Sequence, residues 1–272
     1  MMRKHVRSML PAGASIVRCL CGLVARSAAA WAFSGVAMAL EPIDTDGPDF
    51  VESSEVVPTG RVQYELDLIS AASRRDGSSG SRLSTPGLFK IGFAPDWEGR
   101  FAPEGLQREG GHSGWGNLAL GLKWHALDRD EASFTPAVAW IAHVDVLAGS
   151  SRFGDARANP SLRSVLTWDL PREFALGLMP GVRYGATDEG RHRVAGVMGV
   201  VLNHRFTSRL RAFVEYAAPQ IATGAGGGTL ASWDVGAAWL VSDDTQIGVR
   251  SGIAANRNTP DHYLLFEIAQ RF

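Results

Sequence analysis

The chain has 272 residues, a length that suits one large domain or two small ones, and 45% of them are hydrophobic and 20% charged, which excludes extensive disorder. The first 39 residues hold five of the 27 basic residues and no acidic one, which leaves 22 basic and 28 acidic residues in 40–272. A protein that binds nucleic acid through its phosphates carries a basic surplus, so that class is excluded as well.

Residues 1–39 have the pattern of a cleaved secretory signal peptide. A basic stretch is followed by the apolar run 27–36 and by Ala37-Met38-Ala39, a small-residue cleavage site of the A-x-A type. The alternative is a membrane anchor, although the apolar run is shorter than the roughly 20 residues that a spanning helix needs. Both cysteines, Cys19 and Cys21, lie in this leader, so we expect the mature chain to have no disulfide and no thiolate nucleophile.

Residues 40–59 follow as an acidic segment that carries Pro48 and Pro58, and from residue 60 onward apolar side chains alternate with small or polar ones. In 117–126 one face carries Leu118, Leu120, Leu122 and Trp124. Successive side chains of a strand point to opposite faces, so this pattern predicts strands with one apolar face. The segments are 60–70, 83–94, 97–105, 115–126, 132–147, 160–170, 173–185, 192–206, 209–219, 229–241, 245–256 and 261–272.

Several of these segments have ten or more residues, which is longer than the usual five or six and close to the roughly 9–11 that a tilted strand needs to cross a bilayer. Short turns between them alternate with longer connections: 71–82, 106–114, 148–159, 186–191, 220–228 and 257–260. Transmembrane β-barrels have short periplasmic turns and longer outer loops. The sequence therefore predicts an all-β protein, a transmembrane antiparallel up-and-down β-barrel of about 12 strands over 60–272.

A soluble β-sandwich or lipocalin-like barrel is the alternative, with its apolar face directed inward. The other face of the predicted strands is rich in Gly and Ala, whereas a solvated face prefers Lys, Thr, Glu and Ser, and Lys90 and Lys123 are the only lysines after the leader. This composition favours the membrane barrel, in contact with lipid of the bacterial outer membrane. Aromatic residues near segment ends are expected to form interfacial girdles: Trp97, Trp115, Trp124, Trp168, Tyr184, Tyr216 and Tyr263.

Two stretches resemble one family of Gram-negative outer-membrane proteins. Residues 44–65, from Asp44 to Glu65, are similar to its opening T-D-R-P-D-F-T-E-S…V-P-x-G-x-x-Q-x-E, and 118–124 are similar to its g-D-x-x-l-G-x-K-W strand. Gly47 stands where the family has Arg, and Asn117 where Asp is common. The family is named for the meta-pathway of phenol degradation, and its members are often labelled transporters.

The resemblance covers about 44–272 and implies a barrel that passes small molecules, among which hydrophobic or aromatic compounds are suggested. Phe272 on an alternating last strand also resembles the signal by which the barrel-assembly machinery recognises outer-membrane barrels, although Gln270 departs from that pattern.

Two groups of charged residues are candidates for functional roles. The acidic segment is either a luminal plug or gate, or a periplasmic extension; a plug would pair with inward arginines such as Arg163, Arg183 and Arg211. The plug candidates are Asp44, Asp46, Asp49 and Glu52. The candidates for lining the lumen are Lys123, His125, His143, Asp145, Arg163, Arg183, Arg211, Glu215 and Asp234. These side chains would form either a permeation path or a salt-bridged filling of a closed barrel.

The sequence predicts passive passage of small molecules and no catalysis. An outer-membrane hydrolase is the less favoured alternative, because no G-x-S-x-G elbow occurs and no spacing argues for a nucleophile beside a base. A structural or adhesion barrel with a closed lumen is the other alternative. No cofactor or metal is expected, since His143 and Asp145 share a strand face but provide two ligands at most.

Overall fold

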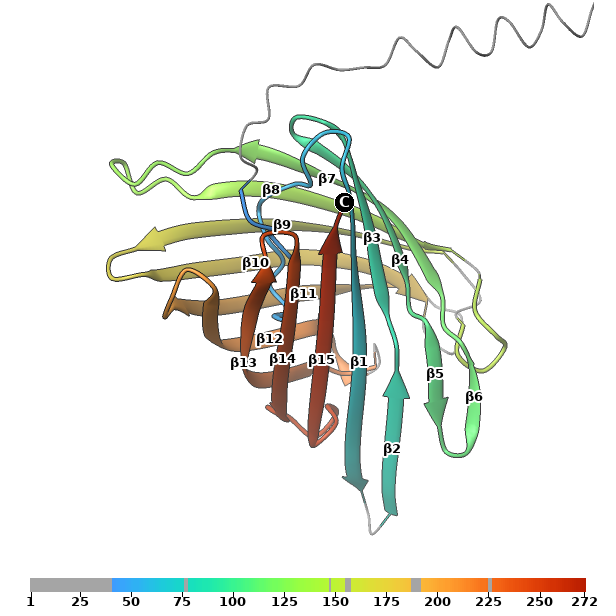
Figure 1. The fold of residues 1–272 in the computed structure, drawn as a ribbon. Coiled ribbons are helices and arrows are strands. Elements are labelled where there is room, and N and C mark those ends of the chain that lie inside the picture. Colours follow the sequence, from blue (N-terminus) through green and yellow to red (C-terminus); the bar gives the residue numbers. More distant parts are fainter. Residues whose placement is uncertain (1–40, 76–77, 147, 155–157, 187–191, 225–226) are drawn as a thin grey trace, which may run out of the picture. The chain divides into compact units, whose positions relative to one another are not determined.

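The alternating segments form fifteen β-strands in one antiparallel sheet (Figure 1). The computed structural model describes residues 41–75, 78–146, 148–154, 158–186, 192–224 and 227–272, so the predicted signal peptide 1–39 lies outside the described residues. The strands are β1 (Val62–Arg75), β2 (Ser78–Ser84), β3 (Gly87–Ala94), β4 (Trp97–Pro103), β5 (Leu106–Glu109), β6 (His112–Trp115), β7 (Leu118–Leu127), β8 (Ala137–Val146), β9 (Asn159–Leu170), β10 (Phe174–Ala186), β11 (His192–Arg205), β12 (Leu210–Ile221), β13 (Leu230–Ser242), β14 (Thr245–Ala254) and β15 (His262–Arg271). No helix in these ranges is long and apolar enough to cross a membrane.

The sheet closes on itself because β1 pairs with β15, from Gln63 opposite Arg271 to Ala72 opposite His262. Closure gives every strand two hydrogen-bonded neighbours, as a sheet in lipid requires, except that the short β6 pairs with β5 alone among the described residues. Three of the barrel strands are each interrupted once and carry two labels: β2 and β3 form one barrel strand, β4 and β5 the next, and β6 and β7 the third. The fifteen labelled segments therefore make twelve barrel strands. The predicted twelve-stranded antiparallel barrel is confirmed.

The three divided strands are interrupted at the same level of the wall. Pro86 has no N–H to donate, and Gly105 has φ +67°, where a Cβ would lie 1.7 Å from the Thr85 carbonyl oxygen. Hydrogen bonds continue across the breaks, for example from Asp67 N–H to the Pro86 carbonyl (3.0 Å). In Figure 1, β2, β5 and β6 continue the wall beyond β3, β4 and β7.

The apolar face points outward. Leu122, Trp140 and Trp233 on the exterior are 47%, 42% and 58% exposed, whereas Ala139 and Ile141 on the inner face are fully buried. A soluble barrel would show the opposite arrangement. An exterior covered in large apolar side chains is stable only against lipid, which decides between the two alternatives left by the sequence.

Most of the predicted girdle aromatics lie on the exterior, and one does not. Trp97 and Trp124 stack with centroids 5.6 Å apart on β4 and β7. Tyr263, which was expected in a girdle, is on the inner face, with its ring centroid 5.4 Å from the Arg250 guanidinium carbon. The reason is the alternation in β15, where Leu264 and Phe266 take the outward positions.

Three predicted boundaries are wrong. Residues 71–82 and 106–114 were expected to be loops, but β1 and β2 nearly meet around 76–77, and β5 and β6 form a hairpin. These extensions are mostly polar, so they carry little period-two signal, yet their backbones remain paired. Residues 132–136 belong to a turn instead of a strand: the Asp130 carboxylate accepts bonds from Ala132 N–H (3.0 Å) and Ser133 Oγ–H (2.7 Å), and Phe134 has φ +56°.

Candidate functional site

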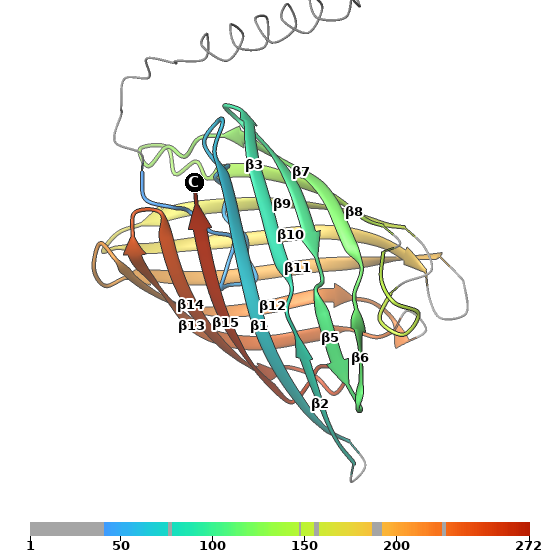
Figure 2. The same ribbon diagram turned by 45° about the vertical axis from the view of Figure 1, so that its right-hand side comes forward.

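The segment before β1 lies inside the barrel and is held at the end with the short turns. Ile43 N–H donates to the Asp243 carbonyl (2.7 Å), and Gly60 N–H donates to the Gly92 carbonyl (2.7 Å). Between these anchors Val51 reaches an apolar cluster on the inner wall. The segment, blue in Figures 1 and 2, thus enters from the short-turn end, descends into the barrel and returns to begin β1. We call residues 42–59 the inner segment.

Glycines in the wall make room for the tip of the inner segment. The apolar cluster consists of Val51, Ala139, Ile141, Val165, Met179, Val201 and Phe213, with Phe50 packed against it. A Cβ on Gly199 would lie 2.6 Å from Val51 Cγ2, and one on Gly177 would lie 3.0 Å from Val51 Cγ1. The small inward residues of the wall here provide the space that a chain segment occupies.

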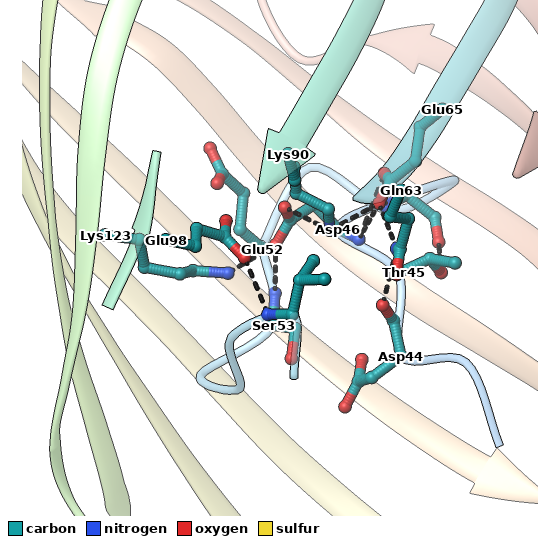
Figure 3. A network of polar contacts seen from close by, with 12 residues as sticks. Asp44, Thr45, Asp46, Glu52, Ser53, Gln63, Glu65, Lys90, Glu98 and Lys123 are labelled. Carbon is teal, nitrogen blue, oxygen red and sulfur yellow. Dashed lines mark hydrogen bonds and ion pairs between the residues drawn. The ribbon is translucent and has the colours of Figure 1, made fainter. Parts of the chain in front are cut away.

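A buried ion network surrounds Asp46 (Figure 3). Its Oδ2 atom lies 2.9 Å from Lys90 Nζ and 3.0 Å from Arg100 Nη2, and its Oδ1 atom lies 2.7 Å from Lys123 Nζ. None of these four side chains is more than 4% exposed. Lys90, Arg100 and Lys123 come from β3, β4 and β7, three adjacent strands. Buried charges persist only when paired, so these contacts tie the inner segment to that wall.

Glu52 extends the network to the neighbouring part of the wall. Its Oε2 atom lies 2.7 Å from Arg100 Nη2, and its Oε1 atom lies 2.5 Å from Arg163 Nη1 on β9. On the other side, the Asp49 carboxylate accepts two bonds from the Arg211 guanidinium (2.8 and 3.1 Å). Carboxylates of the inner segment are therefore paired with cations on β3, β4, β7, β9 and β12.

Backbone N–H groups of the inner segment are satisfied by side chains of the wall. The Glu65 carboxylate accepts from Asp46 N–H (3.1 Å) and Gly47 N–H (3.2 Å), and Glu215 accepts from Phe50 and Val51 N–H (2.8 Å each). Near the return, Val57 N–H donates to Glu98 (2.9 Å). Side-chain acceptors thus replace a strand partner along this stretch, so the segment is held inside the barrel without being a strand of it.

Two acidic groups of the inner segment, Asp46 and Glu52, lie outside the strands and have lowered pKa values. Burial alone would raise the pKa of Asp46, but Arg100, Lys123 and Lys90 hold it well below its usual value. Burial likewise opposes ionisation of Glu52, and Arg100 and Arg163 overcome it, lowering the pKa of Glu52 to about 2. Both carboxylates are therefore ionised at neutral pH.

Several predicted lumen residues contact the inner segment. Lys123 Nζ also donates to the Glu55 carbonyl (3.0 Å), His125 Nδ1 lies 2.8 Å from the Ser54 carbonyl oxygen, and Arg211 Nη2 donates to the Gly47 carbonyl (3.0 Å). Arg163 and Glu215 also reach the segment, as described above.

Other predicted residues contact side chains of the wall within the described ranges. Arg183 was expected to bind the segment, but it lies beyond the segment's tip and pairs with Asp145 instead (3.1 Å). His143 Nδ1 lies 3.1 Å from Arg163 Nη2. Asp234 Oδ2 is 3.9 Å from Arg250 Nη1. Asp44 makes no ion pair with the residues that the structure describes; its carbonyl accepts from Gln63 Nε2 (2.8 Å).

Several charged residues of this interior were absent from the candidates predicted from sequence, among them Glu65, Lys90, Glu98, Arg100, Arg250 and Glu267. The sequence contains the pattern that identifies them, because Phe89, Ile91 and Phe101 are apolar and point outward. Their immediate neighbours along each strand must then point inward. Applying the alternation to 83–94 and 97–105 would have identified Lys90, Glu98 and Arg100. Within the described ranges, no group of three or more His, Cys, Asp or Glu side chains is arranged to hold a metal ion.

Comparison with known proteins finds similar solved structures and one matching family. An outer membrane channel from Pseudomonas putida F1 superposes with a TM-score of 0.64 at 11% identity, covering 81% of this chain and 98% of that chain. The NanC porin superposes with a TM-score of 0.49 at 10% identity, covering 75% and 97%. No curated protein sequence is significantly similar to the chain.

The fold and its apolar exterior place the protein in the outer membrane, as predicted. The family model described as “Putative MetA-pathway of phenol degradation” matches residues 45–272, which confirms the resemblance found in the sequence, and the chain belongs to that family.

Proposed function

We propose that the protein is an outer-membrane channel for the passive passage of small molecules and that the inner segment is its plug. The observation that carries this proposal is the combination of a lipid-facing apolar exterior with a charged interior occupied by a segment that is not a strand. Side-chain contacts can be exchanged one at a time, whereas removing a barrel strand would open the sheet. The segment is therefore the part that can leave the lumen without loss of the barrel.

The lumen on the long-loop side of the plug supports a path for solutes. Arg183 and Asp145 are 39% and 21% exposed there, and Arg163 is 15% exposed nearer the plug. Mixed charges of this kind tune which solutes enter a pore. Hydrophobic or aromatic solutes are proposed on the ground that the family is named for phenol degradation. The ion pairs between the inner segment and the wall also suit the alternative, a structural or adhesion barrel with a permanently filled lumen. We propose passage of solutes in preference to catalysis.

Assembly is proposed to follow the route of exported barrels, with residues 1–39 as the cleaved leader. Phe272 follows β15 on the outer face, 60% exposed, with its ring centroid 5.9 Å from that of Tyr64. An outward aromatic at the seam between β15 and β1 is accessible to the barrel-assembly machinery, which we propose as a partner.

Solute uptake by liposomes containing the refolded protein tests this function. We expect swelling in phenol and in small sugars, with a larger rate for a variant that lacks residues 44–58. If neither protein admits any solute, the structural reading is favoured. Hydrolysis of an ester or phospholipid by the purified protein would contradict the proposal in a different way.

A further inference from the structure

We infer that Lys90, Arg100, Lys123 and Arg163 form a binding site for solutes that carry a carboxylate, and that Asp46 and Glu52 occupy this site as internal ligands. We call these four residues the cation cluster. The inference rests on the channel function proposed above and adds a substrate class to it, small organic carboxylates, including aromatic ones.

The cation cluster has the geometry of a carboxylate receptor. Lys90 and Arg100 are directly opposite each other in the β3–β4 register, and Lys123 is opposite Glu98 in the β4–β7 register. Three cationic groups thus converge on one carboxylate, that of Asp46, at 2.7–3.0 Å. Arg100 and Arg163 hold a second carboxylate, that of Glu52. Charge-assisted contacts of this kind are the strongest that proteins make with carboxylates.

The carboxylates of the wall neutralise only part of the positive charge of the cation cluster, so the remainder needs anions that do not belong to the wall. Its four positive charges meet two carboxylates of the wall, Glu65 on Lys90 and Glu98 on Arg100, and two carboxylates of the inner segment. When the segment leaves, two buried positive charges remain without partners. Buried unpaired charge is costly, so displacement of the plug favours entry of a replacement anion.

The cluster also retains unused hydrogen-bonding capacity. Arg100 is 4% exposed, and among the described residues neither its Nε nor its Nη1 atom has a hydrogen-bond acceptor, although Glu98 Oε1 lies 3.3 Å from Nη1 as an ion-pair contact. An unpartnered guanidinium N–H in the interior of a protein is uncommon, and a carboxylate oxygen is the acceptor it matches best.

Access to the cation cluster is from the long-loop side, through residues of increasing burial. Arg183 is 39% exposed, Arg163 is 15% exposed, and Arg100 is 1% exposed in its side chain. Arg163 lies opposite Gly181, two residues before Arg183 on the neighbouring strand β10. A solute carboxylate that follows this line first reaches the Arg163–Glu52 pair, exchanges with Glu52, and then competes with Asp46. Anion binding and release of the plug are thereby coupled.

Calorimetric titration of the full-length protein in detergent tests this site, with benzoate as the probe and benzyl alcohol as its neutral counterpart. We expect Glu52→Gln to bind benzoate roughly tenfold more tightly than the wild type, because two charge-assisted contacts become available, with no change for benzyl alcohol. Glu55→Gln is the matched control: Glu55 is on the same segment, but its carboxylate pairs with Arg129 near the short-turn rim. Adding Arg163→Gln to Glu52→Gln should remove the gain.

Equal binding of benzoate and benzyl alcohol by Glu52→Gln would overturn the inference, as would a gain of the same size in Glu55→Gln. Binding is measured independently of conduction, so the two proposals fail separately. If the variant that lacks 44–58 passes neutral aromatics while benzoate has no preference for Glu52→Gln, only the carboxylate site is wrong. If benzoate shows the expected pattern but no solute crosses the membrane, the channel function is wrong.

Discussion

Asp46 Oδ1 lies 2.7 Å from Lys123 Nζ, a contact between residues 77 positions apart that joins the inner segment to β7. The Lys123 side chain is fully buried and that of Asp46 is 4% exposed. Because neither charge can reach bulk water, each depends on the other. A buried lysine in the wall is therefore stable only while the segment occupies the lumen.

Asp46→Asn should release the inner segment or destabilise the protein. The substitution leaves Lys90, Arg100 and Lys123 without the carboxylate they share, and breaking a buried ion pair on one side costs about 3–5 kcal/mol. Limited proteolysis of the segment and urea unfolding measure the two outcomes. Asp130→Asn, in an exposed turn, is the control. Wild-type resistance and stability for Asp46→Asn would mean that the network does not hold the segment.

Gly199→Val should expel the tip of the inner segment while leaving the barrel intact. Its Cβ would lie 2.6 Å from Val51 Cγ2, so Val51 loses its seat. Cleavage of the segment by an added protease should increase, with no loss of the strand signal in circular dichroism. A matched substitution is Gly80→Val on β2, where a Cβ would meet no atom within 4 Å. Equal protection of both variants would argue against a built seat.

Acidification should break the ion pairs of Glu52 and loosen the inner segment once the pH falls below about 4.5, the ordinary pKa of a glutamic acid. Burial opposes ionisation of Glu52, but Arg100 on β4 and Arg163 on β9, the latter adjoining His143, lower its pKa from 4.5 to about 2. Because the folded pKa is depressed, the stabilisation is complete above about pH 4.5 and is lost as the pH falls toward 2. Protease sensitivity of the segment should thus be constant from pH 7 to about 5 and rise below about 4. A rise that begins near pH 6 would identify a different titrating group.

Leu122→Arg should impair insertion into lipid. Leu122 is outward and 47% exposed, and arginine on the lipid face of a barrel costs about 2–4 kcal/mol at the membrane centre. Folding into lipid vesicles, followed by urea titration, measures the loss. Ser113→Arg, on the polar strand β6, should cost little. If the two variants were equally stable in vesicles, Leu122 would not face the acyl chains.

The alternation of side chains predicted the barrel and the lipid-facing side, because successive side chains of a strand point to opposite faces of the wall. Leu120 and Leu122 outward and Lys123 inward follow from it without further information. The extension of β1 and β2 to 75 and 78 could not be predicted, since backbone hydrogen bonds hold polar residues in strands as firmly as apolar ones.

The pairing of the inner segment was only partly predictable. Glu52 with Arg163 and Asp49 with Arg211 agree with the expectation of acidic residues meeting inward arginines. The convergence of Lys90, Arg100 and Lys123 on Asp46 depends on the depth to which the segment enters. That depth is determined by the fit of Val51 between Gly177 and Gly199, which no linear pattern encodes.

Passage of solutes depends on a water-filled lumen that residues 42–59 close. Single-channel conductance in planar bilayers, compared between the full-length protein and the variant without residues 44–58, measures this closure. We expect small or infrequent currents for the full-length protein and a several-fold larger, stable conductance for the variant. Identical conductance of the two proteins, with the variant folded, would show that residues 42–59 do not close a lumen.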